Sequence, residues 1–143
     1  MRSRPSIQTG HSVSHRAAWP LVAAILLAAA PPVLAEWMKI YEDEGTVGYI
    51  DPATIKNIDG NLRRVAELLD FKRPDPQFKG ERSHRFVVEY DCKRKLVRVV
   101  SVTGYSERMA QGRITNSAEP KPSWAQLDPH SHHANQLRIA CSK

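Results

Sequence analysis

The clearest pattern of apolar and polar positions lies between residues 83 and 92. Every second side chain there belongs to a largely apolar face, and polar side chains fill most positions between. Because successive side chains of a strand point to opposite sides, this alternation predicts a β-strand with one buried face. The predicted inner face consists of His84, Phe86, Val88, Tyr90 and Cys92, and the outer face of Ser83, Arg85, Glu89 and Asp91, with Val87 as the interruption.

Further strands are predicted on both sides of this one. Two short runs, 37–41 and 47–51, are separated by a polar, glycine-containing segment, which is typical of a hairpin. Residues 62–71 have a pattern that suits a helix or a strand, and the turn signals at both ends favour the strand. Lys93-Arg94-Lys95 predicts a tight turn into a valine-rich strand over residues 96–105, antiparallel to the strand before it. A short edge strand is predicted over residues 113–115.

The remaining segments predict turns and loops. Asp51-Pro52 favours a turn or a single helical turn over residues 51–55, because Asp before Pro suits a capped, bent entry. A second turn is predicted at residues 59–61. Pro74, Pro76 and Gly80 predict an exposed loop over residues 72–81. Loops are also predicted over residues 107–112 and 116–123.

The period of the pattern changes near the C-terminus. Ser131 is placed to cap a helix from His132 to Cys141, in which Ala134, Leu137 and Cys141 share one face. So short a helix does not persist alone, so it must pack on the sheet. The chain is therefore predicted to have an α+β fold, a single antiparallel sheet with a C-terminal helix packed on one face.

The first 35 residues have a different character from the rest. They contain no acidic residue, a basic start, an apolar run over residues 21–30, and Val33-Leu34-Ala35 at their end. These features predict a cleaved signal peptide over residues 1–35, which leaves residues 36–143 as one periplasmic or secreted domain. The apolar run is shorter than the about 20 residues of a spanning helix, so no transmembrane anchor is expected. No cysteine lies near the predicted cut, so the protein is not expected to be lipidated.

The charge balance changes once this leader is set aside. Three of the 21 basic residues and none of the 15 acidic residues lie in it, so the net charge falls from +6 to +3. This modest charge argues against a nucleic-acid partner.

The two cysteines are predicted to form one disulfide, Cys92 to Cys141, as is usual in an exported protein. The chain-entropy model gives roughly 4 kcal/mol for the loop that it would close. The cysteines lack C-x-x-C spacing, so a structural bond is favoured over redox chemistry.

His130, His132 and His133 are the candidate ligands for zinc, copper or haem iron. On a helix the last two would diverge by about 100°, and no cysteine or carboxylate completes the set. Solvated residues at a helix start are therefore favoured, and no cofactor is expected. The sequence contains none of the common nucleophile, phosphate-binding or dinucleotide motifs, so we expect no enzyme. Carboxylate pairs such as Asp43 with Glu44 fall in predicted turns, where a solvated role is favoured over acid–base catalysis.

Basic residues gather in several predicted turns and could form a patch for an acidic partner or an anionic surface, although soluble turns have the same composition. Trp37 and Trp124 are favoured as core residues over binding residues. The candidate patch consists of Arg63, Arg64, Lys93, Arg94 and Lys95, with Lys72-Arg73 as a further basic pair.

Several short motifs occur in a familiar order: Trp37, Gly48-Tyr49-Ile50-Asp51-Pro52 with Ile55, Asp91-Cys92, Tyr105-Ser106, Trp124, Pro129-x-Ser131 and Cys141. In this order the chain resembles the surface-adhesin protein E family of small exported proteins of Gram-negative bacteria. The resemblance covers residues 36–143 and implies an antiparallel sheet of about six strands, with the helix tied to one face by the cysteine pair. It also implies adhesin-like binding of proteins.

The leading hypothesis is an exported non-enzymatic binding module, adhesin-like, which contacts a protein partner such as an extracellular-matrix or envelope protein. The alternatives are a periplasmic haem- or metal-binding carrier, motivated by the three histidines, and a structural component of the cell envelope.

Overall fold

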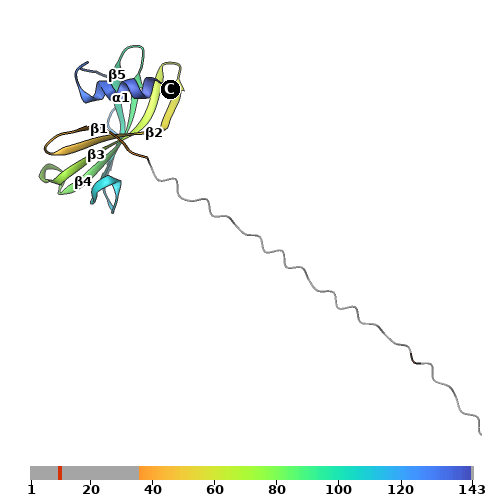
Figure 1. Ribbon diagram of the computed structural model, residues 1–143, viewed down its shortest axis with the longest axis vertical. Coiled ribbons are helices and arrows are strands. Elements are labelled where there is room, and N and C mark those ends of the chain that lie inside the picture. Colours follow the sequence, from red (N-terminus) through yellow and green to blue (C-terminus); the bar gives the residue numbers. More distant parts are fainter. Residues whose placement is uncertain (1–9, 11–35, 143) are drawn as a thin grey trace, which may run out of the picture. The chain divides into compact units, whose positions relative to one another are not determined.

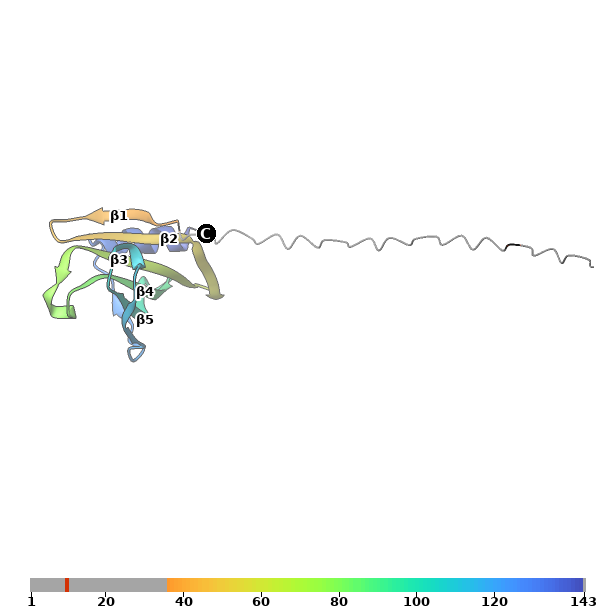
Figure 2. The ribbon, with the colours of Figure 1, turned by 90° about the horizontal axis from the view of Figure 1, so that it is seen from below.

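The strands follow one another across the sheet in the order in which they occur in the chain. The computed structural model describes Gly10 and residues 36–142. Six strands pair antiparallel in the order β1 to β6, and the short β7 pairs with β5 (Figures 1 and 2). The elements are β1 (Met38–Glu42), β2 (Thr46–Asp59), β3 (Leu62–Asp75), η1 (Pro76–Phe78), β4 (Glu81–Asp91), β5 (Leu96–Tyr105), η2 (Arg108–Ala110), β6 (Ile114–Ala118), β7 (Ala125–Gln126) and α1 (His132–Cys141).

The core lies between α1 and one face of the sheet. Register places Val65 opposite Val88, and both are buried together with residues of α1. Figure 1 shows α1 crossing the strands near one end of the sheet. This confirms the predicted α+β fold. The buried cluster consists of Ile50, Val65, Val88, Tyr90, Leu137 and Ala140.

A disulfide ties α1 to the sheet. Cys92 follows the last residue of β4, and Cys141 is the last residue of α1; their Cα atoms lie 5.7 Å apart. The predicted Cys92–Cys141 bond is therefore confirmed, and it fastens the one α-helix among the described residues at its C-terminal end.

The bend predicted at residues 51–55 is wrong, because these residues lie within β2. The strand absorbs Pro52 through an irregularity in its pairing with β3, between Asp51 and Lys56. Side chains satisfy the backbone there: Asp51 accepts a hydrogen bond from the N–H of Ala53, and the hydroxyl of Thr54 accepts one from the N–H of Ala66. The expected bend is thus a bulge inside a long strand.

The loop predicted over residues 72–81 is too long. β3 continues to Asp75, and only residues 76–80 separate it from β4. Pro74 fits the strand because the pairing with β4 is irregular between Asp70 and Asp75, where no ladder hydrogen bond needs its missing N–H. The turn closes through Lys79 and Gly80, both with positive φ.

In two other predicted loops the structure also has more regular secondary structure than expected. The segment 107–112 contains η2, and β6 runs from Ile114 to Ala118 instead of over residues 113–115. Residues 116–118 of the predicted 116–123 crossing are therefore strand.

The helix bounds are as predicted, but two details differ. The Ser131 side chain makes no capping bond to the helix and instead donates to the carbonyl of Asp128. The buried face of α1 is Gln136, Leu137 and Ala140, because the helix is rotated so that Ala134 and Cys141 are only half-buried.

Neither tryptophan of residues 36–142 belongs to the buried core; Trp37 and Trp124 are both half-buried. The prediction that both pack in the core is therefore wrong. No helix among the described residues is long and apolar enough to span a membrane.

Candidate functional site

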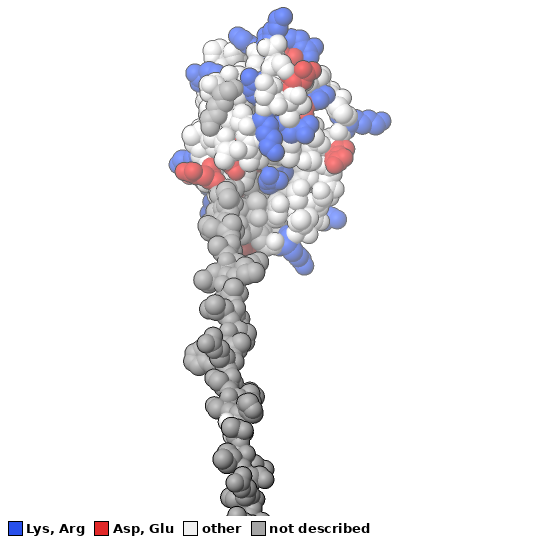
Figure 3. Space-filling view, turned by 90° about the vertical axis from the view of Figure 1, so that its right-hand side faces the viewer, with Lys and Arg blue, Asp and Glu red and all other residues white. Residues whose placement is uncertain are grey.

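The β2–β3 and β4–β5 turns lie side by side at one end of the sheet (top of Figure 1). Leu62 pairs with Asp91, and the N–H of Cys92 donates to the carbonyl of Asn61 at 2.9 Å. Figure 3, which shares its vertical axis with Figure 1, shows Lys and Arg side chains gathered at this end. Two predicted basic segments that are about 30 residues apart in sequence therefore meet in space.

Asp91 organises the β4–β5 turn. Its carboxylate accepts hydrogen bonds from the N–H groups of Lys93 and Arg94, at 3.0 and 2.8 Å, and from Nε of Arg94 at 2.7 Å. These bonds, above all the one from the Arg94 backbone, hold the pKa of Asp91 below its ordinary value. The turn is thereby fixed while Lys93 and Lys95 remain exposed.

A buried carboxylate holds two arginines beside this turn. Glu89 is fully buried, and its two oxygens accept from Arg64 at 2.5 to 2.9 Å and from Arg98 at 2.5 to 2.6 Å. Burial raises the pKa of Glu89, but the hydrogen bonds from Arg64 and Arg98 outweigh it and leave the pKa below its ordinary value. Both guanidinium groups are thus held in place by an ionised partner.

Trp124, in the segment that leads into β7, contacts Arg98 and Arg94. The guanidinium carbon of Arg98 lies 4.5 Å from the centre of the Trp124 ring, and that of Arg94 lies 5.8 Å from it. Both are within the range of a cation–π interaction. We call Arg64, Lys93, Arg94, Lys95, Arg98 and Trp124 the basic end.

Sequence analysis did not single out Arg98. Its position contained a signal, because a tight turn at residues 92–95 places Arg98 directly opposite Glu89 on the neighbouring strand. The contact of Trp124 with the arginines had no comparable signal, because it depends on the path of the chain between β6 and β7.

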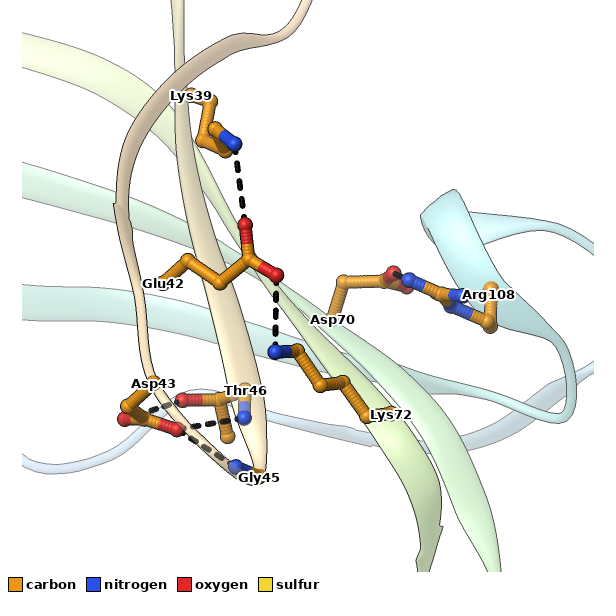
Figure 4. Close-up of polar contacts among 8 residues, drawn as sticks. All are labelled: Lys39, Glu42, Asp43, Gly45, Thr46, Asp70, Lys72 and Arg108. Atoms are coloured by element: carbon orange, nitrogen blue, oxygen red, sulfur yellow. Dashed lines mark hydrogen bonds and ion pairs between the residues drawn. The ribbon is translucent and has the colours of Figure 1, made fainter.

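The other predicted basic residues lie apart from this group. Arg63 neighbours Arg64 in β3, so its side chain points to the opposite face, where it donates to the carbonyl of Gly60. Lys72 and Arg73 lie near the far end of β3, and Lys72 pairs with Glu42 at 2.8 Å (Figure 4). The seven predicted basic residues thus do not form one surface.

The three candidate metal ligands have other partners. His132 stacks on Tyr41 with ring centres 3.9 Å apart, and Nδ1 of His133 bonds Oε1 of Gln136 at 2.9 Å. His130 lies exposed in the turn before α1, where its backbone N–H donates to Asp128. Among the residues that the structure describes, no group of three or more His, Cys, Asp or Glu is arranged to hold a metal ion.

The carboxylates at the acidic β1–β2 turn are engaged in hydrogen bonds and ion pairs. Asp43 accepts hydrogen bonds from the N–H groups of Gly45 and Thr46 and from the Thr46 hydroxyl (Figure 4). Hydrogen bonds from Lys72 and Lys39 lower the pKa of Glu42 to about 2. These carboxylates are therefore ionised and engaged near neutral pH, unlike those of a general acid.

Comparison with known proteins identifies the family. Residues 37–142 match the family model of surface-adhesin protein E. The chain belongs to the surface-adhesin protein E family. Among curated proteins, none matches the chain.

Solved structures of protein E from Haemophilus influenzae share the fold. One is 23% identical to this chain, covers 80% of it and 91% of its own chain, and superposes with a TM-score of 0.57. A second crystal form is 22% identical, covers 80% of this chain and 94% of its own, and has a TM-score of 0.56. The expected resemblance to the surface-adhesin protein E family is thus confirmed.

Proposed function

We propose that this member of the family is an exported, non-enzymatic binding module that holds a protein partner at its basic end. The observation that carries the proposal is a cluster of arginines held by carboxylates at one end of the sheet, two of which, Arg94 and Arg98, lie against Trp124. Tryptophan and arginine are the side chains that most often dominate the energy of protein interfaces.

The arginines of the basic end are held before any partner arrives. Glu89 fixes Arg64 and Arg98, and Asp91 fixes Arg94, so little side-chain entropy is lost when a partner binds. Lys93 and Lys95 project from the turn and add positive charge. An acidic segment of an extracellular-matrix or envelope protein suits this surface, since complementary charge speeds association.

The remaining parts of the proposal concern location. Residues 1–35 lie outside the described residues, apart from Gly10, and we propose that they are a signal peptide which directs residues 36–143 to the periplasm or the exterior. The proposal includes neither a membrane anchor nor a lipid anchor. Membership of a surface-adhesin family supports export.

Charge reversal at the basic end tests the proposal. The variant Lys93→Glu, Lys95→Glu should weaken binding to an immobilised panel of extracellular-matrix proteins by about tenfold or more, because opposite charges at the contact are replaced by like charges. The matched control, Arg73→Glu with Arg113→Glu, changes the same number of charges at the other end of the sheet and should bind as the parent does. Equal losses in both variants would show that total charge, not the basic end, governs binding.

A further inference from the structure

A cavity of about 400 Å³ lies between the start of α1 and the sheet, on the face that carries the core. Strands β3, β4 and β5 contribute apolar walls, among them Leu69, Phe86, Val88 and Val99. Its volume equals that of roughly a dozen liquid waters, which suits a ligand of roughly ten non-hydrogen atoms.

Two stacked rings lie over this cavity. Tyr41 from β1 and His132 from α1 both line it, with ring centres 3.9 Å apart and planes inclined by 26°. Gly48 makes this arrangement possible, because a Cβ atom there would lie 1.9 Å from Cε1 of Tyr41. The cavity therefore has an aromatic wall that depends on the absence of a side chain at one position.

Among the polar groups of the cavity, the Glu67 carboxyl group and a ring nitrogen of His133 are acceptors, whereas the amide nitrogen of Gln136 and the hydroxyl of Tyr41 are donors. Glu67 is buried at 5% exposure, and one of its carboxyl oxygens accepts the hydroxyl hydrogen of Tyr90. The amide oxygen of Gln136 can only accept, so Nδ1 of His133 donates to it and Nε2 of the neutral ring is left as an acceptor. A ligand that donates hydrogen bonds complements the two acceptors.

We propose that this cavity binds a small primary amine with an apolar body, its ammonium group toward Glu67 and its body against the aliphatic and aromatic walls. An ammonium group supplies donors only, and aromatic faces attract it. This site is separate from the basic end, so the inference stands whether or not that surface binds a protein.

The titratable groups around Glu67 determine how binding depends on pH. Burial raises the pKa of Glu67 to about 7, and burial together with the neighbouring His133 lowers that of His132. Burial also raises the pKa values of Tyr41 and Tyr90, so both stay neutral. At about pH 8 the Glu67 carboxyl group is ionised and the His132 imidazole is neutral, which favours the amine; acidification should weaken binding.

Titration of the purified full chain with 2-phenylethylamine at about pH 8, followed by amide NMR shifts, tests the proposal. The amine should bind saturably and shift residues that line the cavity. Two probes of similar size but different charge serve as controls: 2-phenylethanol should bind at least about tenfold more weakly, and phenylacetate more weakly still. Equal binding of amine and alcohol, tighter binding of phenylacetate, or shifts confined to other surfaces would overturn it.

Two variants test separately the charge of Glu67 and the free volume of the cavity. Glu67→Gln keeps the size of the side chain. It should lower the affinity for 2-phenylethylamine by about tenfold or more and leave the affinity for 2-phenylethanol unchanged. Val99→Phe fills the cavity and should abolish binding of both. If Glu67→Gln fails to fold, the comparison of the three probes on the parent chain still decides.

Discussion

At the scale of single residues, three buried carboxyl groups of the sheet differ in their partners. Glu89 is paired with two arginines, and Asp70 is paired with Arg108. Within the part of the chain that the structure describes, Glu67 has only the hydroxyl of Tyr90 as a hydrogen-bond partner. A buried carboxyl group without a cation is disfavoured in its charged form. Glu67 is therefore the acid whose ionisation opposes folding.

Glu67 should make the protein less stable as pH rises. Its pKa is raised from 4.5 to about 7 in the folded protein, so the folded state binds the proton more tightly than the unfolded state does. The stabilising contribution is complete below about pH 4.5 and is lost as pH rises to about 7, by about 3 kcal/mol. Denaturant unfolding of the parent and of Glu67→Gln across this range should show the loss in the parent only; parallel curves would contradict it.

Sequence could not reveal this environment. Glu67 lies in a strand of mixed pattern, and its burial follows from register, which places it between Ile50 of β2 and Phe86 of β4. The partner Tyr90 is on the inner face as predicted, yet nothing in the spacing of the two residues links them. The Glu89–Arg98 pair, in contrast, follows from a turn that sequence does predict.

At the scale of elements, α1 depends on its attachment. It has ten residues, and its buried face is small. The double variant Cys92→Ala, Cys141→Ala should lose about 2 to 5 kcal/mol of stability, because the bond closes a long loop. Hydrogen exchange should rise first in residues 132–141. An unchanged melting temperature would contradict this expectation, and a chemically reduced parent, which keeps both side chains, is the matched control.

The η2 segment is attached in a different way, by a side chain of β3. Asp70 accepts a hydrogen bond from Nε of Arg108 at 2.7 Å (Figure 4). It accepts a second from the N–H of Met109, also at 2.7 Å. Met109 and Ala110 have positive φ, a conformation that needs such support.

The variant Asp70→Asn should therefore release this segment. The loss of the charged acceptor should lower stability by about 1 to 3 kcal/mol and speed hydrogen exchange over residues 107–112. Arg113→Ala, which lies beside the segment but outside the contact, should leave exchange there unchanged. If exchange in the Asp70 variant matches the parent, η2 is held by other contacts.

The elements that sequence predicted well are those with a simple period: β4, β5 and α1. The errors in β2 and β3 have one cause. Proline predicts the end of a strand, but Pro52 and Pro74 lie at irregularities where the ladder does not need their N–H groups. A long strand with a bulge has no local signature that separates it from a strand followed by a turn.

At the scale of the whole molecule, the proposed signal peptide makes a prediction about the mature N-terminus. If residues 1–35 are a signal peptide, the exported protein should begin at Glu36, directly after the small residue Ala35. Intact-mass measurement of material from the periplasm or the medium checks this. Exported protein that retains residues 1–35 would contradict the proposal, and protein from a strain blocked in export should show the uncut mass.

The order of the strands has a consequence for how the molecule is made. Each of β2 to β6 pairs with the strand before it in the chain, so a polypeptide that emerges amino end first can add one strand at a time. The exception is the bond between Cys92 and Cys141, because its second sulfur lies near the end of the chain. Cys92 therefore meets its partner sulfur only after all the strands of the described residues have been synthesised. The disulfide then fastens α1 to strands that have already been made.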